Sequence, residues 1–147
     1  GVLVVGVGDL MTQLARCCRP VPPDPVGGFV TRGRGVSVHR RDCASFAELS
    51  RKAPERVIEC GWGVPAAGVR RVYPVEVVLR ARDRQGLLRD VSDVFARDRI
   101  NVVAVSTLSR DQVATMGFTV EVADTNELAR ALAAVREVAG VIQARRR

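Results

Sequence analysis

The spacing of apolar residues between positions 72 and 147 constrains the fold more than any other feature of the chain. Residues 73–80 alternate apolar and polar side chains, which is the period of a strand with one buried face. A turn at residues 83–86 follows. Apolar residues then recur at helical spacing, at Leu87, Leu88, Val91, Val94 and Phe95. This part of the chain therefore predicts a strand followed by an amphipathic helix.

The remaining residues extend this pattern. Residues 100–107 and 113–122 predict two strands around the polar turn at 109–112, and Asp124 or Thr125 is expected to cap a further helix. A last strand is predicted at residues 140–144. The order βαββαβ predicts a ferredoxin-like α+β fold, with two helices on one face of a four-stranded antiparallel sheet. Such a sheet leaves its edge strands unpaired, so we expect a homodimer formed by side-by-side association.

Proline and glycine divide the chain before this pattern begins. They cluster at residues 20–25 and 61–68, and only the second cluster is followed by a complete new set of elements. We place the boundary at about residues 62–71, with a first module at residues 1–65 and a second domain at residues 70–147.

The first module is predicted to be a small α+β unit. Residues 28–31 and 36–39 are short strand-like runs, and the glycines at 33 and 35 suit a tight hairpin between them. Asp42 is expected to cap a helix that ends near Lys52, and residues 56–60 are expected to return as a strand. Residues 10–18 are expected to be helical or irregular.

Hydropathy and cysteine content argue against a membrane protein, a secreted protein and a disulfide-rich fold. No apolar run reaches the length of a membrane span, and the apolar start at residues 2–5 is too short for a secretion signal, so we expect a soluble, cytoplasmic chain with no membrane partner. The four cysteines include an adjacent pair in a chain that is not disulfide-dense. Metal binding or simple burial of the thiols is the expected use.

The charge favours a polyanionic partner. The net charge is +7, and only one of the 23 basic residues is a lysine, Lys52. Guanidinium groups bind phosphate oxygens in pairs. Residues 1–71 carry 11 basic and 6 acidic side chains, whereas residues 72–147 carry 12 and 10, so the first module is the better candidate for nucleic acid. A solvated basic surface is the alternative.

Two sequence motifs carry a family resemblance. Residues 82–91 read R-D-R-Q-G-L-L-R-D-V and are followed by I-N-V at 100–102, which resembles the signature of the ACT domain. Residues 10–20, with the adjacent cysteines, and residues 28–43 resemble the zinc-finger-like or ribosome–intersubunit domain that precedes ACT in long RelA/SpoT (p)ppGpp synthetases/hydrolases. One departure is Pro23, which stands where a glycine is usual in that family.

The resemblance implies a regulatory segment of a GTP pyrophosphokinase acting in the stringent response. It implies contact with ribosomal RNA and with tRNA on the ribosome, and communication with the catalytic domains of a full-length chain. No catalytic residue is expected here. Two other classes of function are compatible with parts of the sequence, a free-standing amino-acid sensor and an enzyme using Cys43 and His39. The enzyme is disfavoured because no phosphate loop or acid/base pair accompanies those residues.

Cys17, Cys18, His39 and Cys43 are the candidate metal ligands. Three thiolates and one imidazole are the ligand types that tetrahedral zinc selects. The adjacent cysteines are a difficulty, because neighbouring side chains point apart unless the backbone turns. The alternative is a packed group of buried thiols around a histidine that is hydrogen-bonded to Asp42 or to backbone. In either case the four side chains are expected to lie close together, and Cys60 is expected in the core.

Four arginines near the predicted hairpin are the candidate RNA contacts: Arg32, Arg34, Arg40 and Arg41. No acidic residue interrupts them before Asp42, and turns expose their side chains. A solvated loop is the alternative.

The loop that opens the ACT-like helix is a candidate site for a small carboxylate, because helix N-termini offer free N–H groups. By resemblance to ACT domains that bind amino acids, Asn101 would complete the site across a dimer interface. The alternative is a loop kept for its turn and helix cap. The residues are Asp83, Arg84, Gly86, Leu87, Leu88 and Asn101.

Overall fold

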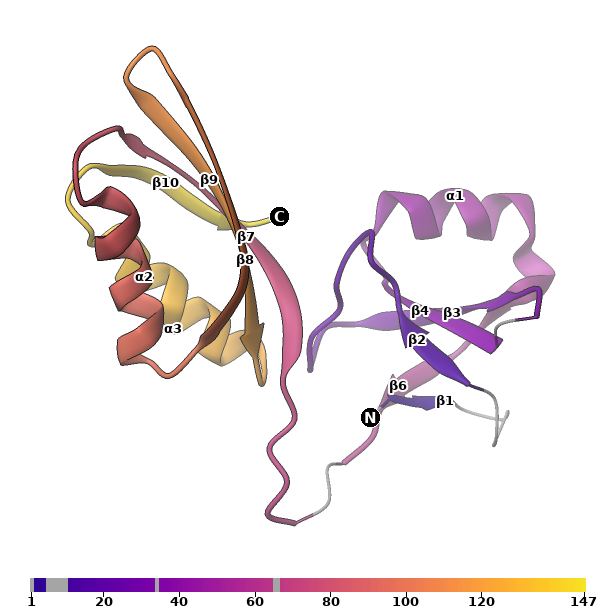
Figure 1. Cartoon of the computed structure of the whole chain (residues 1–147). Coiled ribbons are helices and arrows are strands. Elements are labelled where there is room, and N and C mark those ends of the chain that lie inside the picture. The colour runs from indigo at the N-terminus through magenta and orange to yellow at the C-terminus, as the bar shows by residue number, and fades with distance from the viewer. Residues whose placement is uncertain (1, 5–10, 34, 65–66) are drawn as a thin grey trace. The chain divides into compact units, whose positions relative to one another are not determined.

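The computed structural model describes residues 2–4, 11–33, 35–64 and 67–147 (Figure 1). The chain divides into two compact units, residues 1–71 and 72–147, each of which has its own sheets. Among the helices in these ranges, none combines the length and the apolar content needed to cross a bilayer.

The second unit is a four-stranded antiparallel sheet with two helices on one face (Figure 1). The strands lie in the order β10-β7-β9-β8, which is the arrangement of a ferredoxin-like βαββαβ unit. The predicted fold class is therefore confirmed. The elements are β7 (Tyr73–Arg82), α2 (Leu87–Arg97), β8 (Asn101–Arg110), β9 (Val113–Val122), α3 (Thr125–Arg136) and β10 (Val141–Arg146).

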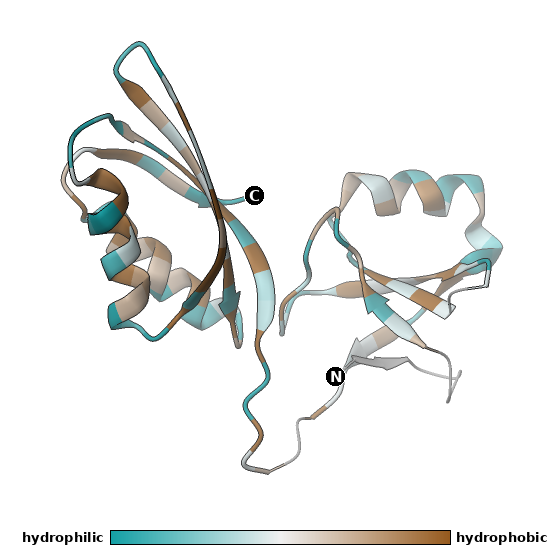
Figure 2. Ribbon diagram, in the orientation of Figure 1, coloured by the Kyte–Doolittle hydropathy of each residue, from teal (hydrophilic) through white to brown (hydrophobic). Residues whose placement is uncertain are grey.

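The core of this unit lies between the sheet and the helices. Every second residue of β7 is buried, from Val75 through Leu79 to Ala81, and the residues between them are more exposed. Figure 2 shows the matching change between hydrophobic and more polar residues along the strands of this unit. Phe95 of α2 and Phe118 of β9 are both essentially inaccessible to solvent, and their ring centroids are 5.3 Å apart. Burial of large apolar side chains from both layers is what holds the helices on the sheet.

Local backbone features set the ends of these elements. Asp111 and Gln112 have φ values of 52° and 64° and form a two-residue turn between β8 and β9. The turn is therefore shorter than the predicted one at 109–112, because β8 continues to Arg110. The Asp124 carboxylate accepts a hydrogen bond from the Glu127 N–H at 2.8 Å. Asp124, rather than Thr125, is therefore the N-cap of α3.

The first unit contains a small sheet with the strand order β2-β4-β3-β5, and a separate two-stranded pair, β1 with β6. The predicted hairpin is β3 (Val26–Thr31) and β4 (Gly35–Arg40), and these strands are antiparallel. β2 pairs parallel with β4, whereas β5 pairs antiparallel with β3. The other elements are β1 (Val2–Val4), β2 (Thr12–Leu14), α1 (Ala44–Lys52), the 3-10 turn η1 (Pro54–Arg56), β5 (Val57–Ile58) and β6 (Cys60–Trp62).

Three expectations for this unit were wrong. The segment expected to be helical or irregular contains β2, which is too short for its period to show in the sequence. Backbone pairing fixes it instead, since the Val36 N–H donates to the Met11 carbonyl at 2.8 Å. Gly35, at φ 81°, permits this close approach, because a Cβ there would collide with that carbonyl oxygen.

The other two errors concern residues 42–60. The single strand expected at residues 56–60 is divided between η1, β5 and β6, and the two strands belong to different sheets. Asp42 does not cap α1. Cys43 is the N-cap residue, and the Asp42 carboxylate instead accepts from Arg40 at 2.9 Å.

The packing of Phe95 against Phe118 gives a test of the second unit. Phe95→Ala removes a fully buried ring and leaves a cavity, so we expect the free energy of unfolding to fall by about 3–5 kcal/mol. Urea denaturation followed by circular dichroism measures this change. Leu88→Ala, at a side chain of α2 that is 47% exposed, is the control and should change stability by less than about 0.5 kcal/mol. Equal effects of the two variants would contradict the assigned core.

Candidate functional site

Cys17, Cys18, His39 and Cys43 form one group in the first unit. Their ligand atoms all lie within 4.8 Å of one another. The Cys17 Sγ is 3.4 Å from the His39 Nδ1 and 3.6 Å from the Cys43 Sγ, and it is 4.0 Å from the Cys18 Sγ. The structure thus brings together all four candidate ligands from three separate segments of the chain.

Pairing of β2 with β4 places the adjacent cysteines beside His39. The Ala15 N–H donates to the Val38 carbonyl at 2.8 Å, and the Arg19 N–H donates back to the Ala15 carbonyl at 3.0 Å. These two bonds close a turn around the cysteine pair, and Arg19 adopts a positive φ of 49°. The turn lets both thiols face the group, which removes the difficulty posed by their adjacency in the sequence.

The neighbours of His39 orient its ring toward the thiols. Its Nε2 lies 3.1 Å from the Ser37 hydroxyl, and its ring stacks on Phe46 at 5.3 Å. The Nδ1 is therefore directed at the two thiols. Burial lowers the pKa of His39, which favours the neutral imidazole that binds metals. The expected hydrogen bond to Asp42 is not formed, since Ser37 takes that place.

The three thiols differ in how readily they ionise. Burial raises the pKa of Cys18 to about 12, although the Arg40 N–H, 3.3 Å from its sulfur, favours the thiolate. Burial and the neighbouring Cys43 also raise the pKa of Cys17. For Cys43, burial opposes ionisation, but backbone N–H groups at the start of α1 and the neighbouring thiols outweigh it and the pKa is lowered. A bound divalent cation would favour all three thiolates.

The donor set matches a small tetrahedral cation. A tetrahedron with metal–sulfur bonds of about 2.3 Å has sulfur–sulfur edges of roughly 3.8 Å, close to the separations of 3.6 and 4.0 Å found between the Cys17 sulfur and its two thiol neighbours. The group can therefore hold a metal ion. Cys60 is not part of it, because this thiol is buried in a separate cluster with Val26, Val36 and Val38. That placement agrees with the expected core role.

The structure does not bring the candidate RNA-binding arginines together. Arg32 is exposed at the turn of the β3–β4 hairpin, and Arg34 lies outside the described residues. Arg40 and Arg41 lie at the opposite end of β4, roughly 20 Å away for a strand of this length. Arg40 is paired with Asp42, and the Arg41 Nε donates to the Val26 carbonyl at 2.9 Å. Arg32 is thus the described member whose charge is most available to a partner.

Several residues of the candidate ligand loop in the second unit have structural roles as a helix cap, a core side chain or a backbone hydrogen-bond donor. Gly86, with φ 81°, is the N-cap of α2, Leu87 is buried in the core and Leu88 is exposed. The Asp83 N–H donates to the Gln112 carbonyl at 2.9 Å. Asn101 donates to Glu121 at 2.8 Å and begins β8 at the far end of α2 from the loop. Within one chain, Asn101 therefore does not meet the loop.

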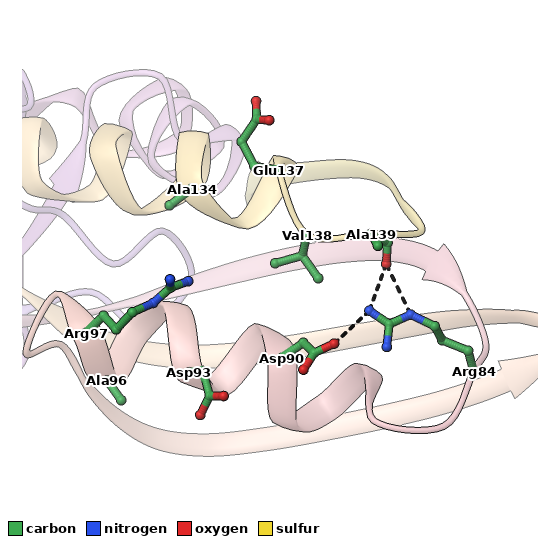
Figure 3. A pocket seen from close by; sticks show the side chains of 9 residues that line it. All are labelled: Arg84, Asp90, Asp93, Ala96, Arg97, Ala134, Glu137, Val138 and Ala139. Atoms are coloured by element: carbon green, nitrogen blue, oxygen red, sulfur yellow. Dashed lines mark hydrogen bonds and ion pairs between the residues drawn. The ribbon is translucent and has the colours of Figure 1, made fainter.

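Arg84 lies at one end of a groove between α2 and α3, which has a volume of about 670 Å³. Figure 3 shows its guanidinium between the Asp90 carboxylate, at 2.8 Å, and the Ala139 carbonyl, at 3.0 Å. This contact lowers the pKa of Asp90. Asp93, Arg97 and Glu137 also line the groove. Sequence reasoning missed the groove because its residues come from two helices that are distant in the sequence.

The chain therefore has two parts. A module with the thiol–imidazole group comes first, and a ferredoxin-like unit of the ACT class follows it. Residues 2–63 match the RelA/SpoT RIS domain, and residues 70–146 match the ACT domain. The chain thus carries a RelA/SpoT RIS domain followed by an ACT domain, and its second unit belongs to the ACT domain family. Neither matched domain is a catalytic domain of these enzymes.

Curated sequences and a solved structure are similar to this chain. The chain is 45% identical over 148 residues to a GTP pyrophosphokinase of Escherichia coli (strain K12), covering 99% of this chain and 19% of the relative. It is 47% identical over 142 residues to the GTP pyrophosphokinase of Streptomyces coelicolor, covering 96% of this chain and 16% of the relative. The chain thus spans about a fifth of the length of these relatives. The crystal structure of the ACT domain from GTP pyrophosphokinase of Chlorobium tepidum is 18% identical, with a TM-score of 0.47, and covers 52% of this chain and 99% of that domain.

The Cys/His group gives a prediction for metal binding. We expect one zinc ion per chain by elemental analysis, and a cobalt-substituted form with the absorption of a tetrahedral thiolate site. Affinity should fall as pH is lowered, because three thiols must lose protons to bind the ion. Cys43→Ser should abolish stoichiometric binding, whereas Cys60→Ala, outside the group, should retain it. Metal-free protein that binds neither ion would leave the packed-thiol alternative standing.

Proposed function

We propose that this chain is the regulatory, ribosome- and tRNA-sensing segment of a RelA/SpoT GTP pyrophosphokinase, acting in the cytoplasm in the stringent response. One observation carries the proposal: a RIS domain and an ACT domain follow each other over nearly the whole chain, and the chain covers only a fifth of GTP pyrophosphokinases that match it. The nucleotide chemistry would then belong to catalytic domains of a longer chain, which this segment regulates.

The first unit is the proposed contact with the ribosome. Arg32 is exposed at the tip of the β3–β4 hairpin, where it can reach phosphates without first leaving a partner within the protein. Arg34, two positions further along the sequence, is proposed to act with it, and Arg40 and Arg41 would extend the contact along the base of the hairpin. Recognition of folded RNA by shape and backbone charge suits such a set of guanidinium groups.

Zinc is the proposed ion of the Cys/His group, and its role would be structural. The four ligands come from the turn after β2, from β4 and from the start of α1. An ion bound to all of them would link these three segments and fix the base of the hairpin. A closed site with four protein ligands leaves no open position for a substrate, so catalysis by the ion is not part of the proposal.

The second unit is the proposed dimer contact. β8 is an edge strand of ten residues that presents Val103 and Leu108 to solvent, at 57% and 71% exposure. Pairing with a second copy would cover this edge. An amino-acid ligand at the Asp83–Leu88 loop, completed by Asn101 of a second copy, stays a prediction. It has no specific support here because Arg84 already binds Asp90 and Ala139.

Ribosome binding is tested by co-sedimentation of the purified chain with ribosomes. Replacing Arg32, Arg34, Arg40 and Arg41 by glutamine should reduce apparent affinity by more than about tenfold at physiological salt, because these groups displace counterions from phosphates. The double variant Arg32→Gln, Arg34→Gln measures the contribution of these two arginines apart from that of Arg40 and Arg41. Arg89→Gln with Arg97→Gln, on α2, is the charge-matched control for this double variant. Unchanged sedimentation of the quadruple variant would move the contact away from the hairpin.

Dimer formation is tested by analytical ultracentrifugation. We expect a dimer at micromolar concentration, and Val103→Glu with Leu108→Glu should shift it to monomer because charges would face each other across the paired edges. The control is Ile142→Glu, which places a charge at an exposed position of the other edge strand, β10. A wild-type chain that stays monomeric at high concentration would rule out this association.

A further inference from the structure

The three thiols of the Cys/His group differ in how far solvent reaches them. Cys17, in the turn after β2, is exposed, whereas Cys18 and Cys43 are buried, each at 9% exposure. Oxidation of thiols is selective for those that solvent can reach. A small oxidant that arrives from solvent therefore meets Cys17 first.

Cys43 is the thiol best placed to react with an oxidised Cys17. The two sulfurs are 3.6 Å apart, although the residues are separated by 26 positions in the sequence. A disulfide needs a sulfur–sulfur distance of about 2.05 Å, so the two atoms must approach by roughly 1.5 Å. Changes in side-chain torsion angles supply a movement of this size, so the backbone of the group need not rearrange.

The other two thiols are less suited to this bond. The Cys18 sulfur is 4.0 Å from that of Cys17, but the Cα atoms of adjacent residues are only about 3.8 Å apart, below the range of roughly 4.4–6.8 Å that disulfides span. The Arg40 N–H also donates to the Cys18 sulfur at 3.3 Å, which holds this thiol against β4. Cys60 is buried in a separate cluster. Cys17 and Cys43 are therefore the preferred pair.

We propose that Cys17 and Cys43 are a site of reversible oxidation by peroxide, which joins them in a disulfide. The Cys17 thiolate attacks one oxygen of hydrogen peroxide, the O–O bond breaks and hydroxide leaves, which gives a sulfenic acid. The Cys43 thiolate then attacks the Cys17 sulfur, the S–S bond forms, the S–O bond breaks and a second hydroxide leaves. The two sulfurs together lose two electrons to the peroxide, and both hydroxide ions take up protons to become water.

The disulfide removes two of the four ligands of the proposed zinc site. Cys18 and His39 remain, and two ligands do not complete the tetrahedral set of a structural zinc ion, so the ion is released. The disulfide still joins the turn after β2 to the start of α1, but β4, which carries His39, loses its link to them. Release of the ion rests on the proposed zinc site, whereas formation of the disulfide does not.

The test treats the whole 147-residue chain, loaded with zinc, with hydrogen peroxide. Free thiols are alkylated with iodoacetamide in denaturant, the disulfide is then reduced, and the thiols that appear are labelled with N-ethylmaleimide. Tandem mass spectrometry, which separates the adjacent Cys17 and Cys18 by fragmentation, should find maleimide on Cys17 and Cys43 and the first label on Cys18 and Cys60.

A zinc-sensitive dye follows the metal in the same reaction. We expect release of one zinc ion per disulfide formed, because the two remaining ligands do not hold the ion. Dithiothreitol with added zinc should restore both the thiols and the bound metal, because a disulfide is reduced by exchange with another thiol.

Two single variants give the matched comparison. Cys17→Ser should form no disulfide at Cys43, whereas Cys60→Ala, outside the group, should form it to the wild-type extent. Circular dichroism establishes that both are folded. If Cys17→Ser does not fold, the labels on the wild-type chain still identify the pair.

Three results would overturn the inference. These are maleimide on Cys18 in place of Cys17, a disulfide formed only between two chains, and thiols that stay free at a peroxide concentration that oxidises glutathione in parallel. A Cys17–Cys43 disulfide in a chain that holds no zinc would support the oxidation site and contradict the proposed zinc site instead. Ribosome co-sedimentation is a separate measurement, so failure of the proposed function leaves this result unchanged.

Discussion

The first unit depends on the meeting of three segments at the Cys/His group. About seventy residues can bury only a modest apolar core, and units of this size commonly need a metal or another cross-link. Here the core is divided further, into one cluster around Val36 and Val38 and another around Phe29 and Phe46. Cys18 and Cys43 belong to the second cluster. The group that offers metal ligands is thus also the group that connects β2, β4 and α1.

The second unit reaches stability by a different route. Its sheet pairs β7 with β9 along ten residues, and both helices bury apolar side chains against the same face. The buried residues of this unit include no cysteine, because all four cysteines belong to the first unit. The two units therefore have independent sources of stability. A regulator built in this way can change the order of one unit while the other keeps its fold.

Secondary structure could be predicted from the sequence where a strand or helix is long enough to show its period. It could not be predicted where a short strand is defined only by pairing with a distant segment. The βαββαβ order followed from β7, α2 and β9, whose periods extend over about ten residues each. β2 has three residues, so its period is invisible, and only its bonds to β4 define it. The four candidate ligands were found because residue type alone restricts metal chemistry. The arginines of the hairpin were grouped by sequence distance, although a strand separates Arg32 from Arg40.

Net charge is a poor guide to where this chain binds, because many of its arginines are committed to the fold. The Arg41 Nε donates to the Val26 carbonyl, the Arg56 Nε donates to the Val30 carbonyl at 2.8 Å, and Arg136 donates to the Ala144 carbonyl at 2.8 Å. Such groups keep their charge but are fixed against the backbone, so moving them toward a phosphate costs a hydrogen bond worth about 1.5–3 kcal/mol.

Exposed guanidinium groups that hold no such bond bear no comparable cost. Arg32 at the hairpin tip and Arg80, Arg82 and Arg110 on the sheet are of this kind within the described part of the chain. The first module carries more excess positive charge, yet two of its four candidate arginines, Arg40 and Arg41, are bound to other groups of the fold. Availability of a cation, rather than its count in the sequence, therefore decides which arginines of this chain can meet a phosphate.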